Sequence, residues 1–209
     1  MMSLQIQNVV TSGTFSLDGG TWDVDNNIWI VGDDSEVVII DAAHMAGPIL
    51  DAVGGRTVKA ILLTHGHNDH ITVAPELSTE TGAPILLHPG DDMLWNDTHP
   101  DVGHGDLADG QEIEVAGTAL TIINTPGHSP GSSVIYAPEA GVLFSGDTLF
   151  QGGPGATGRS FSSFPTIIES IRTKIFTLDP ETKVYTGHGD GTTVAAEAPH
   201  LEEWITRGN

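Results

Sequence analysis

The chain has 209 residues, and its 28 acidic residues outnumber its 7 basic ones, which gives a net charge of −21. This length allows a sizeable hydrophobic core, so we expect residues 1–209 to form a single domain. A surface this negative repels phosphate backbones and anionic lipids, which makes nucleic acids and membranes poor partners. Cysteine is absent, and this excludes disulfides, thiol nucleophiles and cysteine-ligated metals.

The N-terminal segment gives an expectation about location. Residues 1–8 lack both the basic region and the apolar region of a secretory signal. No apolar run approaches the roughly 20 residues that a membrane-spanning helix needs. We therefore expect a cytoplasmic protein.

The first half of the chain predicts mainly strands. β-rich runs at 28–31 and 37–40 are separated by Gly32-Asp33-Asp34, which is a hairpin signal. The apolar run within 59–64 has strand length and is typical of a strand that is buried on both faces. A short helix over 73–81 and another strand over 83–87 are expected to follow.

The second half predicts further strands and two helices. The expected strands cover 112–115, 119–124, 132–136, 142–144 and 183–186. One helix is expected to open at Pro165, followed by isoleucines at helical spacing, and a closing helix is expected over 194–205. Residues 152–163 form the longest irregular loop. Strands, a helix, strands and a helix in this order indicate an α/β protein with two packed sheets covered by helices.

Histidines and aspartates cluster at the ends of predicted strands. Residues 65–70 read His-Gly-His-Asn-Asp-His, and further donors follow in turns that contain glycine. Imidazole and carboxylate without thiolate form a ligand set suited to zinc, iron or manganese. The seven candidate metal ligands are His65, His67, Asp69, His70, His128, Asp147 and His188. Seven donors are too many for one tetrahedral ion, but they suffice for two ions that each keep a position for water.

The spacing within the first motif indicates how the donors divide. On an extended loop, His65 and His67 point the same way and can hold one ion. Asp69 and His70 fall where the chain turns into a helix, so they can face a second ion. A carboxylate has two oxygens and can bridge, which leaves Asp147 as the natural shared ligand.

Four segments in order carry a resemblance to a known family: 65–70, Thr125-Pro126-Gly127-His128-Ser129-Pro130-Gly131, 144–150 and Tyr185-Thr186-Gly187-His188-Gly189. With them the chain, from about residue 26 to 200, resembles the metallo-β-lactamase-fold hydrolases, and among these the small single-domain glyoxalase II-like (hydroxyacylglutathione hydrolase-like) members. The resemblance implies a four-layer αββα sandwich with the metals at one edge. It also implies a first metal on His65, His67 and His128, and a second on Asp69, His70 and His188, with Asp147 between them.

The chain also departs from this family. A Gly-Gly pair that often follows the first motif is replaced here by Ile71-Thr72. The family segment that contacts the thiol portion of the substrate corresponds to 158–161. The resemblance therefore implies a substrate-binding role for Arg159, with a loop-anchoring salt bridge as the alternative. The preceding residues are unlike those of the family, so the thiol carrier stays open.

These features lead to a dinuclear metal-dependent hydrolase as the hypothesis. Two divalent ions, zinc before iron or manganese, would supply a bridging hydroxide that attacks a (hydroxy)acyl thioester of a low-molecular-weight thiol. Asp69 would orient this hydroxide and act as the catalytic residue. The main alternative in the same fold is a persulfide dioxygenase with one ferrous ion on two His and one Asp. Lactonase, β-lactamase and ribonuclease readings remain, as does a non-catalytic metal-binding protein, although open coordination positions favour chemistry.

Several other residues have competing interpretations. Asp41 ends an apolar strand, where it either caps a turn or accepts a hydrogen bond from a ligand imidazole. Residues 153–160 come close to a phosphate-binding loop, but arginine replaces its lysine and no helix follows directly, which favours a substrate-facing loop. The four tryptophans are expected to pack in the core or against helices rather than to form a stacking platform. Five histidines lie outside the motifs and are expected to be structural: His44, His88, His99, His104 and His200.

Overall fold

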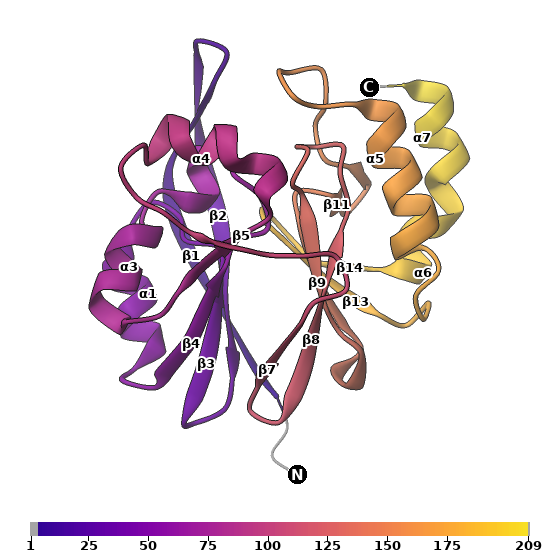
Figure 1. Ribbon diagram of the computed structural model, residues 1–209. Helices are drawn as coiled ribbons and strands as arrows, with labels where there is room; N and C mark the ends of the chain where they lie inside the picture. Colours follow the sequence, from indigo (N-terminus) through magenta and orange to yellow (C-terminus); the bar gives the residue numbers. More distant parts are fainter. Residues whose placement is uncertain (1–3, 209) are drawn as a thin grey trace.

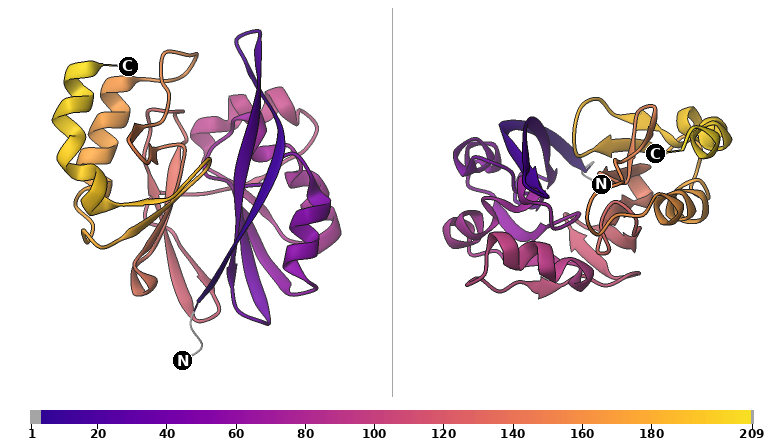
Figure 2. Two further views of the ribbon diagram at one scale, coloured as in Figure 1. Left: turned by 180° about the vertical axis from the view of Figure 1, so that it is seen from behind. Right: turned by 90° about the horizontal axis from the view of Figure 1, so that it is seen from above.

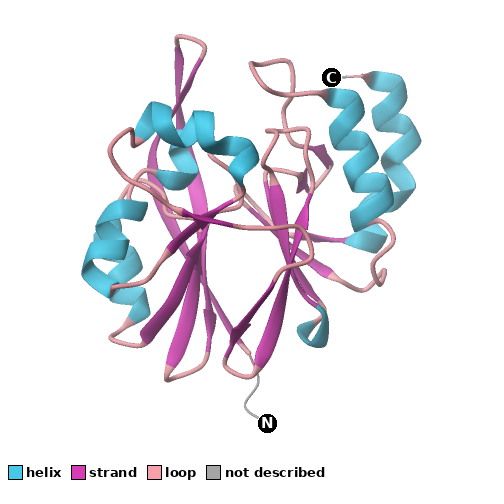
Figure 3. Cartoon of the chain, viewed as in Figure 1, coloured by secondary structure: helices cyan, strands magenta, loops and turns pink. Residues whose placement is uncertain are grey.

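The computed structural model describes residues 4–208. Residues 1–3, which belong to the N-terminal segment considered above for a secretory signal, lie outside this range, as does residue 209. Two β-sheets face each other in the middle of the molecule, and each carries helices on its outer face (Figure 1, Figure 3). This arrangement confirms the predicted α/β sandwich of four layers. In the part of the chain that is described, no helix is long and apolar enough to span a membrane.

The first sheet is built from the N-terminal half of the chain. Its order is β1 (Gln5–Leu17), β2 (Gly20–Gly32), β3 (Glu36–Ile40), β4 (Thr57–Leu62), β5 (Ile85–Leu87) and β6 (Gly105–Asp106). The strands from β1 to β3 pair antiparallel, whereas those from β3 to β6 pair parallel. The carboxyl ends of the parallel strands therefore lie at one edge, where loops can gather functional side chains.

The second sheet is built from the C-terminal half. Its order is β14 (Thr192–Thr193), β13 (Lys183–Thr186), β10 (Val142–Gly146), β9 (Ser133–Ala137), β8 (Thr118–Asn124) and β7 (Glu112–Val115). Only β10 and β13 pair parallel. A small ribbon of β11 (Leu149–Phe150) and β12 (Gly153–Pro154) follows β10.

Helices cover the outer faces of both sheets (Figure 2). The first sheet carries α1 (Ala46–Val53), α2 (Asn68–Ile71), α3 (Ala74–Thr81) and α4 (Asp92–Thr98), and the second carries α5 (Phe164–Ser170), α6 (Val194–Glu197) and α7 (Leu201–Arg207). A π-helical turn, Ile171–Ile175, continues α5. Short 3₁₀ turns occupy Pro89–Asp91, Pro138–Ala140 and Ala198–His200.

Three apolar layers hold the sandwich together, and the alternation along β3 shows how. Val37 and Ile39 pack toward the helices, whereas Val38 and Ile40 pack toward the second sheet. Successive side chains of a strand point to opposite faces, so a continuous apolar run can serve two layers at once. The third layer packs the second sheet against α5 and α7 through residues that include Ile167 and Trp204.

Comparison with the predicted elements shows where local patterns were insufficient. The strands at 112–115 and 183–186 occur with the predicted bounds, and the strand predicted over 37–40 begins one residue earlier. The run at 28–31 is the end of a 13-residue strand that pairs with β1, which was not predicted. The helices α1 and α4 were missed, β12 lies within the predicted irregular loop, and a 3₁₀ turn interrupts the closing helix. Pro199 lies in that turn, where a missing N–H is tolerated.

Candidate metal centre

The seven predicted metal ligands come together at the carboxyl ends of strands. His65 and His67 follow β4, and His128 lies in the loop between β8 and β9. Asp147 follows β10 directly, and His188 follows β13. Asp69 and His70 lie on α2, the four-residue helix that begins just after His67. The structure thus gathers donors from both sheets at one edge of the sandwich.

The donor atoms form three overlapping groups. Within each group every ligand atom lies within 4.8 Å of the others. The groups are His65 with His67 and His128, His65 with His70 and Asp147, and Asp69 with His70 and His188. The first and third correspond to the two predicted metal positions, and the second combines Asp147 with one histidine from each.

Asp41 contacts both the first motif and the imidazole of a candidate ligand, which is the second of its two predicted roles. It accepts hydrogen bonds from the backbone N–H of Thr64 at 2.8 Å and from the Thr64 hydroxyl at 2.9 Å, which ties down the first motif. Its Oδ2 lies 2.9 Å from Nδ1 of His70. Because a carboxylate only accepts, Nδ1 of His70 donates, and in the neutral ring Nε2 has its lone pair toward the cluster.

Two further imidazoles are oriented by backbone carbonyls. Nδ1 of His128 lies 2.8 Å from the carbonyl oxygen of Ala156, and Nδ1 of His188 lies 2.7 Å from that of Asp25. A carbonyl oxygen fixes the proton on Nδ1, so Nε2 of each ring faces the cluster as a potential ligand. The loop over 152–163 therefore orients His128, and β2 orients His188, although neither histidine belongs to the segment that orients it.

Unpartnered atoms inside the cluster show that its residues fit metal ions. Among residues 4–208, Nε2 of His65, Nε2 of His67 and Oδ1 of Asp147 are buried without a hydrogen-bond partner. Each such atom costs free energy unless something satisfies it. Divalent ions would satisfy all three, and imidazole with carboxylate is the ligand set that such ions accept.

Electrostatics divide the cluster into two halves. Burial, followed by nearby imidazoles, lowers the pKa of His67 to about 3 and holds the pKa of His65 well below its usual value. Burial also opposes charge on His188 and His70, but the Asp147 carboxylate outweighs it. The pKa of His188 rises to about 10, and that of His70 rises well above normal. Without metal, His65 and His67 are therefore neutral, whereas His70 and His188 hold protons against carboxylates.

Asp91 joins the two loops of the first metal position and was not predicted from the sequence. It is fully buried and accepts hydrogen bonds from the backbone N–H of Gly66 at 2.8 Å and of Gly131 at 2.6 Å. It also accepts one from the Ser129 hydroxyl at 2.6 Å. Burial raises the pKa of Asp91, so this carboxylate is held at an energetic cost. A Cβ at Gly131 would lie 2.7 Å from the carboxyl carbon, which explains why glycine is needed there.

A pocket of about 290 Å³ opens onto the cluster. It is lined by Phe15, Trp22, Val24, His67, Asp69, His128, Asp147, Phe150, Ala156, Arg159 and His188. Metal donors form its floor, whereas the β1–β2 hairpin and the loop over 152–163 supply apolar walls. A small organic group could therefore lie between an apolar wall and the metal donors.

Arg159 lies at the wall of this pocket in an aromatic stack. Its guanidinium carbon is 3.8 Å from the centre of the Trp22 ring and 5.2 Å from that of Phe15. The next residue, Ser160, donates two hydrogen bonds to Asp18 at the hairpin tip. The expectation that Trp22 packs in the core or against a helix was wrong, because it is 42% exposed and stacks with Arg159 and Phe15. The other three tryptophans are buried, as expected.

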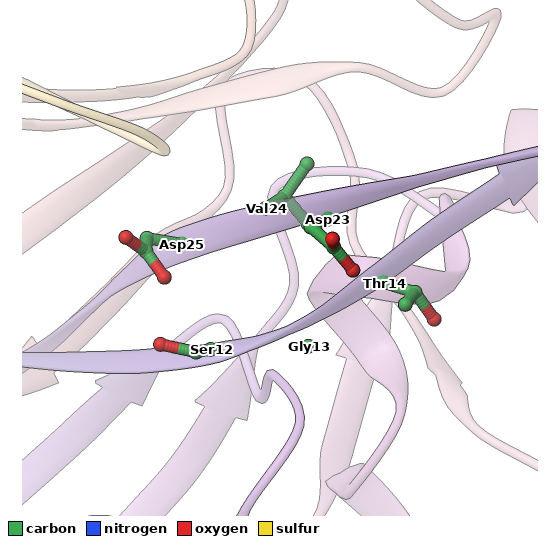
Figure 4. A pocket seen from close by; sticks show the side chains of 6 residues that line it. All are labelled: Ser12, Gly13, Thr14, Asp23, Val24 and Asp25. Atoms are coloured by element: carbon green, nitrogen blue, oxygen red, sulfur yellow. The ribbon is translucent and has the colours of Figure 1, made fainter.

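A second hollow, of about 390 Å³, lies on the hairpin itself and does not reach the cluster (Figure 4). Ser12 and Thr14 from β1 and Asp23 and Asp25 from β2 contribute side chains to it. Both carboxylates are solvent-exposed. Exposed acidic side chains are a common feature of a solvated face, so the pocket over the cluster is the better candidate site.

Asn26 also reaches the cluster, although nothing in its sequence context signals it. It lies on β2 and is fully buried, and its Nδ2 donates to Oδ2 of Asp69 at 3.1 Å. Its Oδ1 lies 2.7 Å from Nε2 of His44, one of the histidines expected to be structural. Backbone alternation then turns the neighbouring Asn27 toward the carbonyls of Thr186 and Gly189.

Comparison with known proteins identifies the family. Residues 21–188 match the model of the metallo-beta-lactamase superfamily, so the chain belongs to that superfamily. Proteins of this superfamily typically bind divalent metals, in keeping with the His/Asp groups found here.

Particular relatives are similar over most of the chain. The hydroxyacylglutathione hydrolase GloC of Haemophilus influenzae is 31% identical over 186 residues, which cover 81% of this chain and 87% of GloC. A crystal structure of TTHA1623 in a di-iron-bound form superposes with a TM-score of 0.76 at 30% identity, covering 84% of this chain and 93% of that one. The structure of ETHE1 from Myxococcus xanthus gives a TM-score of 0.74 at 24% identity, covering 91% and 83%, and shows the shared fold alone.

Proposed function

We propose that this chain is a dinuclear metal-dependent hydrolase that cleaves a (hydroxy)acyl thioester of a low-molecular-weight thiol. The observation that carries the proposal is the continuous set of donor groups, in which two triads are joined by a third that contains Asp147, beside a partly apolar pocket. The likeness to a hydroxyacylglutathione hydrolase supports the thioester as the substrate class.

In this proposal His65, His67 and His128 hold one ion, and Asp69, His70 and His188 hold the other, with Asp147 shared. Bound divalent ions, zinc before iron or manganese, would supply hydroxide at neutral pH and polarise the substrate carbonyl. The triads lie side by side, so a carbonyl carbon on the pocket floor could be reached from either position.

The chain's own residues supply orientation and charge. We assign Asp69 the role of orienting the attacking water, since it lines the pocket and neighbouring His70 and His188 outweigh burial to keep its pKa below normal. An ionised carboxylate can accept a hydrogen bond from that water. Arg159 and the rings of Phe15 and Trp22 would receive the thiol portion. A thiolate leaves readily, so no strong general acid is required.

The test combines metal content with turnover. Purified protein would be analysed for metals and assayed with thioesters that carry anionic and neutral thiols. Two divalent ions per chain together with thioester hydrolysis support the proposal. One iron per chain together with oxygen consumption on a persulfide would instead favour the mononuclear dioxygenase. Two ions without turnover of any thioester would refute the thioester assignment.

A further inference from the structure

Asn26 occupies an unusual place relative to the second metal position. Its Nδ2 lies 3.1 Å from Oδ2 of Asp69, 3.2 Å from Nε2 of His70 and 3.5 Å from Nε2 of His188. These three atoms are the donors of one of the metal-binding groups. A buried carboxamide therefore faces all the protein donors of that group at once.

The distances among these four atoms correspond to a coordination polyhedron. Nε2 of His70 and Nε2 of His188 are 3.2 Å apart, and they lie 3.6 Å and 3.4 Å from Oδ2 of Asp69. With the amide atom included, every edge of the tetrahedron measures between 3.1 and 3.6 Å. Donor atoms about 2.1 Å from a tetrahedral ion lie about 3.4 Å from one another. The terminal amide atom of Asn26 therefore completes a tetrahedron with these three donor atoms, and the shared Asp147 would be a further ligand.

The amide can present either of its two terminal atoms to this position. In the structure Nδ2 points inward and donates to Asp69, while Oδ1 faces Nε2 of His44 at 2.7 Å. A positive ion among these donors would repel the N–H groups and attract the amide oxygen. After rotation of the amide, Nδ2 would donate to His44, because a neutral imidazole offers one donor and one acceptor nitrogen.

We propose that Asn26 is a ligand of the second metal ion through Oδ1, and that His44 is the positioning residue that accepts from the rotated amide. This inference rests on the proposed two-metal site. Asn26 would add a neutral oxygen to a set of two imidazoles and the carboxylates of Asp69 and Asp147. The added hard donor favours a higher coordination number at this position than at the all-histidine one.

The test is a titration of metal-free protein with zinc and, separately, with cobalt, followed by calorimetry and by visible absorption of the cobalt form. The parent protein should bind two ions. Asn26→Ala should weaken the step that fills the second metal position (the second step) at least ten-fold and leave the other step unchanged. Asn26→Asp should keep or strengthen the second step, because the aspartate retains an oxygen at this place. Asn96→Ala, the same truncation on the exposed side of α4, should match the parent in both steps.

The outcomes separate this inference from the proposal beneath it. A parent protein that binds one ion would refute the two-metal site itself. With two ions in the parent, unchanged second-step affinity in Asn26→Ala would refute the ligand role. A second step weakened in both variants would show that Asn26 acts as an N–H donor to Asp69, which a second carboxylate would repel. If Asn26→Ala fails to fold, the nearly isosteric Asn26→Asp alone decides between oxygen ligand and N–H donor.

Discussion

Replacing Asp91 should damage the first metal position without touching a single proposed ligand. Its carboxylate holds the loop of His65 and His67 against the loop of His128 by accepting from Gly66 and Gly131. Asp91→Ala would leave both backbone N–H groups buried and unpaired. The third donor, the Ser129 hydroxyl, still has the Ser132 hydroxyl at 2.8 Å.

The magnitude follows from these contacts. Two unsatisfied buried N–H groups cost about 1–3 kcal/mol each, or roughly 2–6 kcal/mol together. Burial disfavours the Asp91 carboxylate, as its raised pKa indicates, so removing this group offsets part of the destabilisation. We therefore expect the free energy of unfolding to fall by about 3 kcal/mol. For a chain of this length, that corresponds to a fall in Tm of roughly 6–12 °C.

Metal affinity should separate this effect from general destabilisation. Loosening residues that orient ligands lowers metal affinity about 10- to 100-fold, so Asp91→Ala should weaken the ion held by the three histidines while the other ion stays within about three-fold. Zinc calorimetry and thermal unfolding would measure both effects. Asp92→Ala removes the neighbouring, largely exposed carboxylate and is the matched control. Unchanged affinity at the three-histidine position in Asp91→Ala would refute this reasoning.

Three further predictions concern the cluster and its pocket. Asp147→Ala should cost both ions because the carboxylate is shared, and two tightly bound ions in that variant would contradict the assignment. Arg159→Ala should raise KM for anionic thioesters roughly three- to ten-fold with unchanged metal content. Trp22→Ala should act in the same direction, because it removes the ring on which Arg159 stacks. An Arg159→Ala variant with the kinetics of the parent would show that Arg159 does not bind the substrate. In the metal-free protein His188, with a pKa of about 10, and His70 carry protons at pH 7, so zinc binding should release protons. Calorimetry in buffers of different ionisation enthalpy should show this release, and an apparent affinity independent of pH between 6 and 8 would contradict it.

The same pKa shifts fix the direction of stability changes in the metal-free protein. The pKa of His188 is higher in the folded than in the unfolded chain, so its stabilisation is complete below pH 6.5 and is lost as pH rises toward about 10. His67 has the opposite shift, to about 3, so stability falls as pH drops below 6.5. The metal-free protein should therefore be most stable near neutral pH.

The sequence was most informative where donors lie close together along the chain. His65, His67, Asp69 and His70 share one six-residue segment, and their predicted division between two positions rests on an extended loop followed by the start of a helix. The apolar run within 59–64 likewise predicted a strand buried on both faces, which is β4. Such features are local, because period and spacing are properties of a short segment.

Residues that act through distant partners could not be predicted in this way. Asp91 is an unremarkable residue after a Pro-Gly turn, and its role appears only when folding brings Gly131 to it, 40 positions away. Asn26 precedes an apolar strand, and its amide meets His188 across 162 positions. The long β1 strand has mixed polarity because its outer half projects beyond the core as a hairpin (Figure 1).

The strongly negative charge of the chain makes the position of Arg159, stacked on Trp22 beside the pocket, important for binding an anionic substrate. With a net charge of −21, the surface opposes any anionic substrate, and the carboxylates of Asp69 and Asp147 add to this at the pocket floor. Arg159 is the one arginine or lysine among the residues that line the pocket. Its guanidinium stacks on Trp22, so the positive charge is held at the pocket wall while its N–H groups stay available for a ligand. Metal ions would neutralise the floor, and Arg159 would then be the wall residue that distinguishes an anionic thiol from a neutral one. Loss of that discrimination in Arg159→Ala, with metal content intact, is therefore the sharpest expected sign of an anionic carrier.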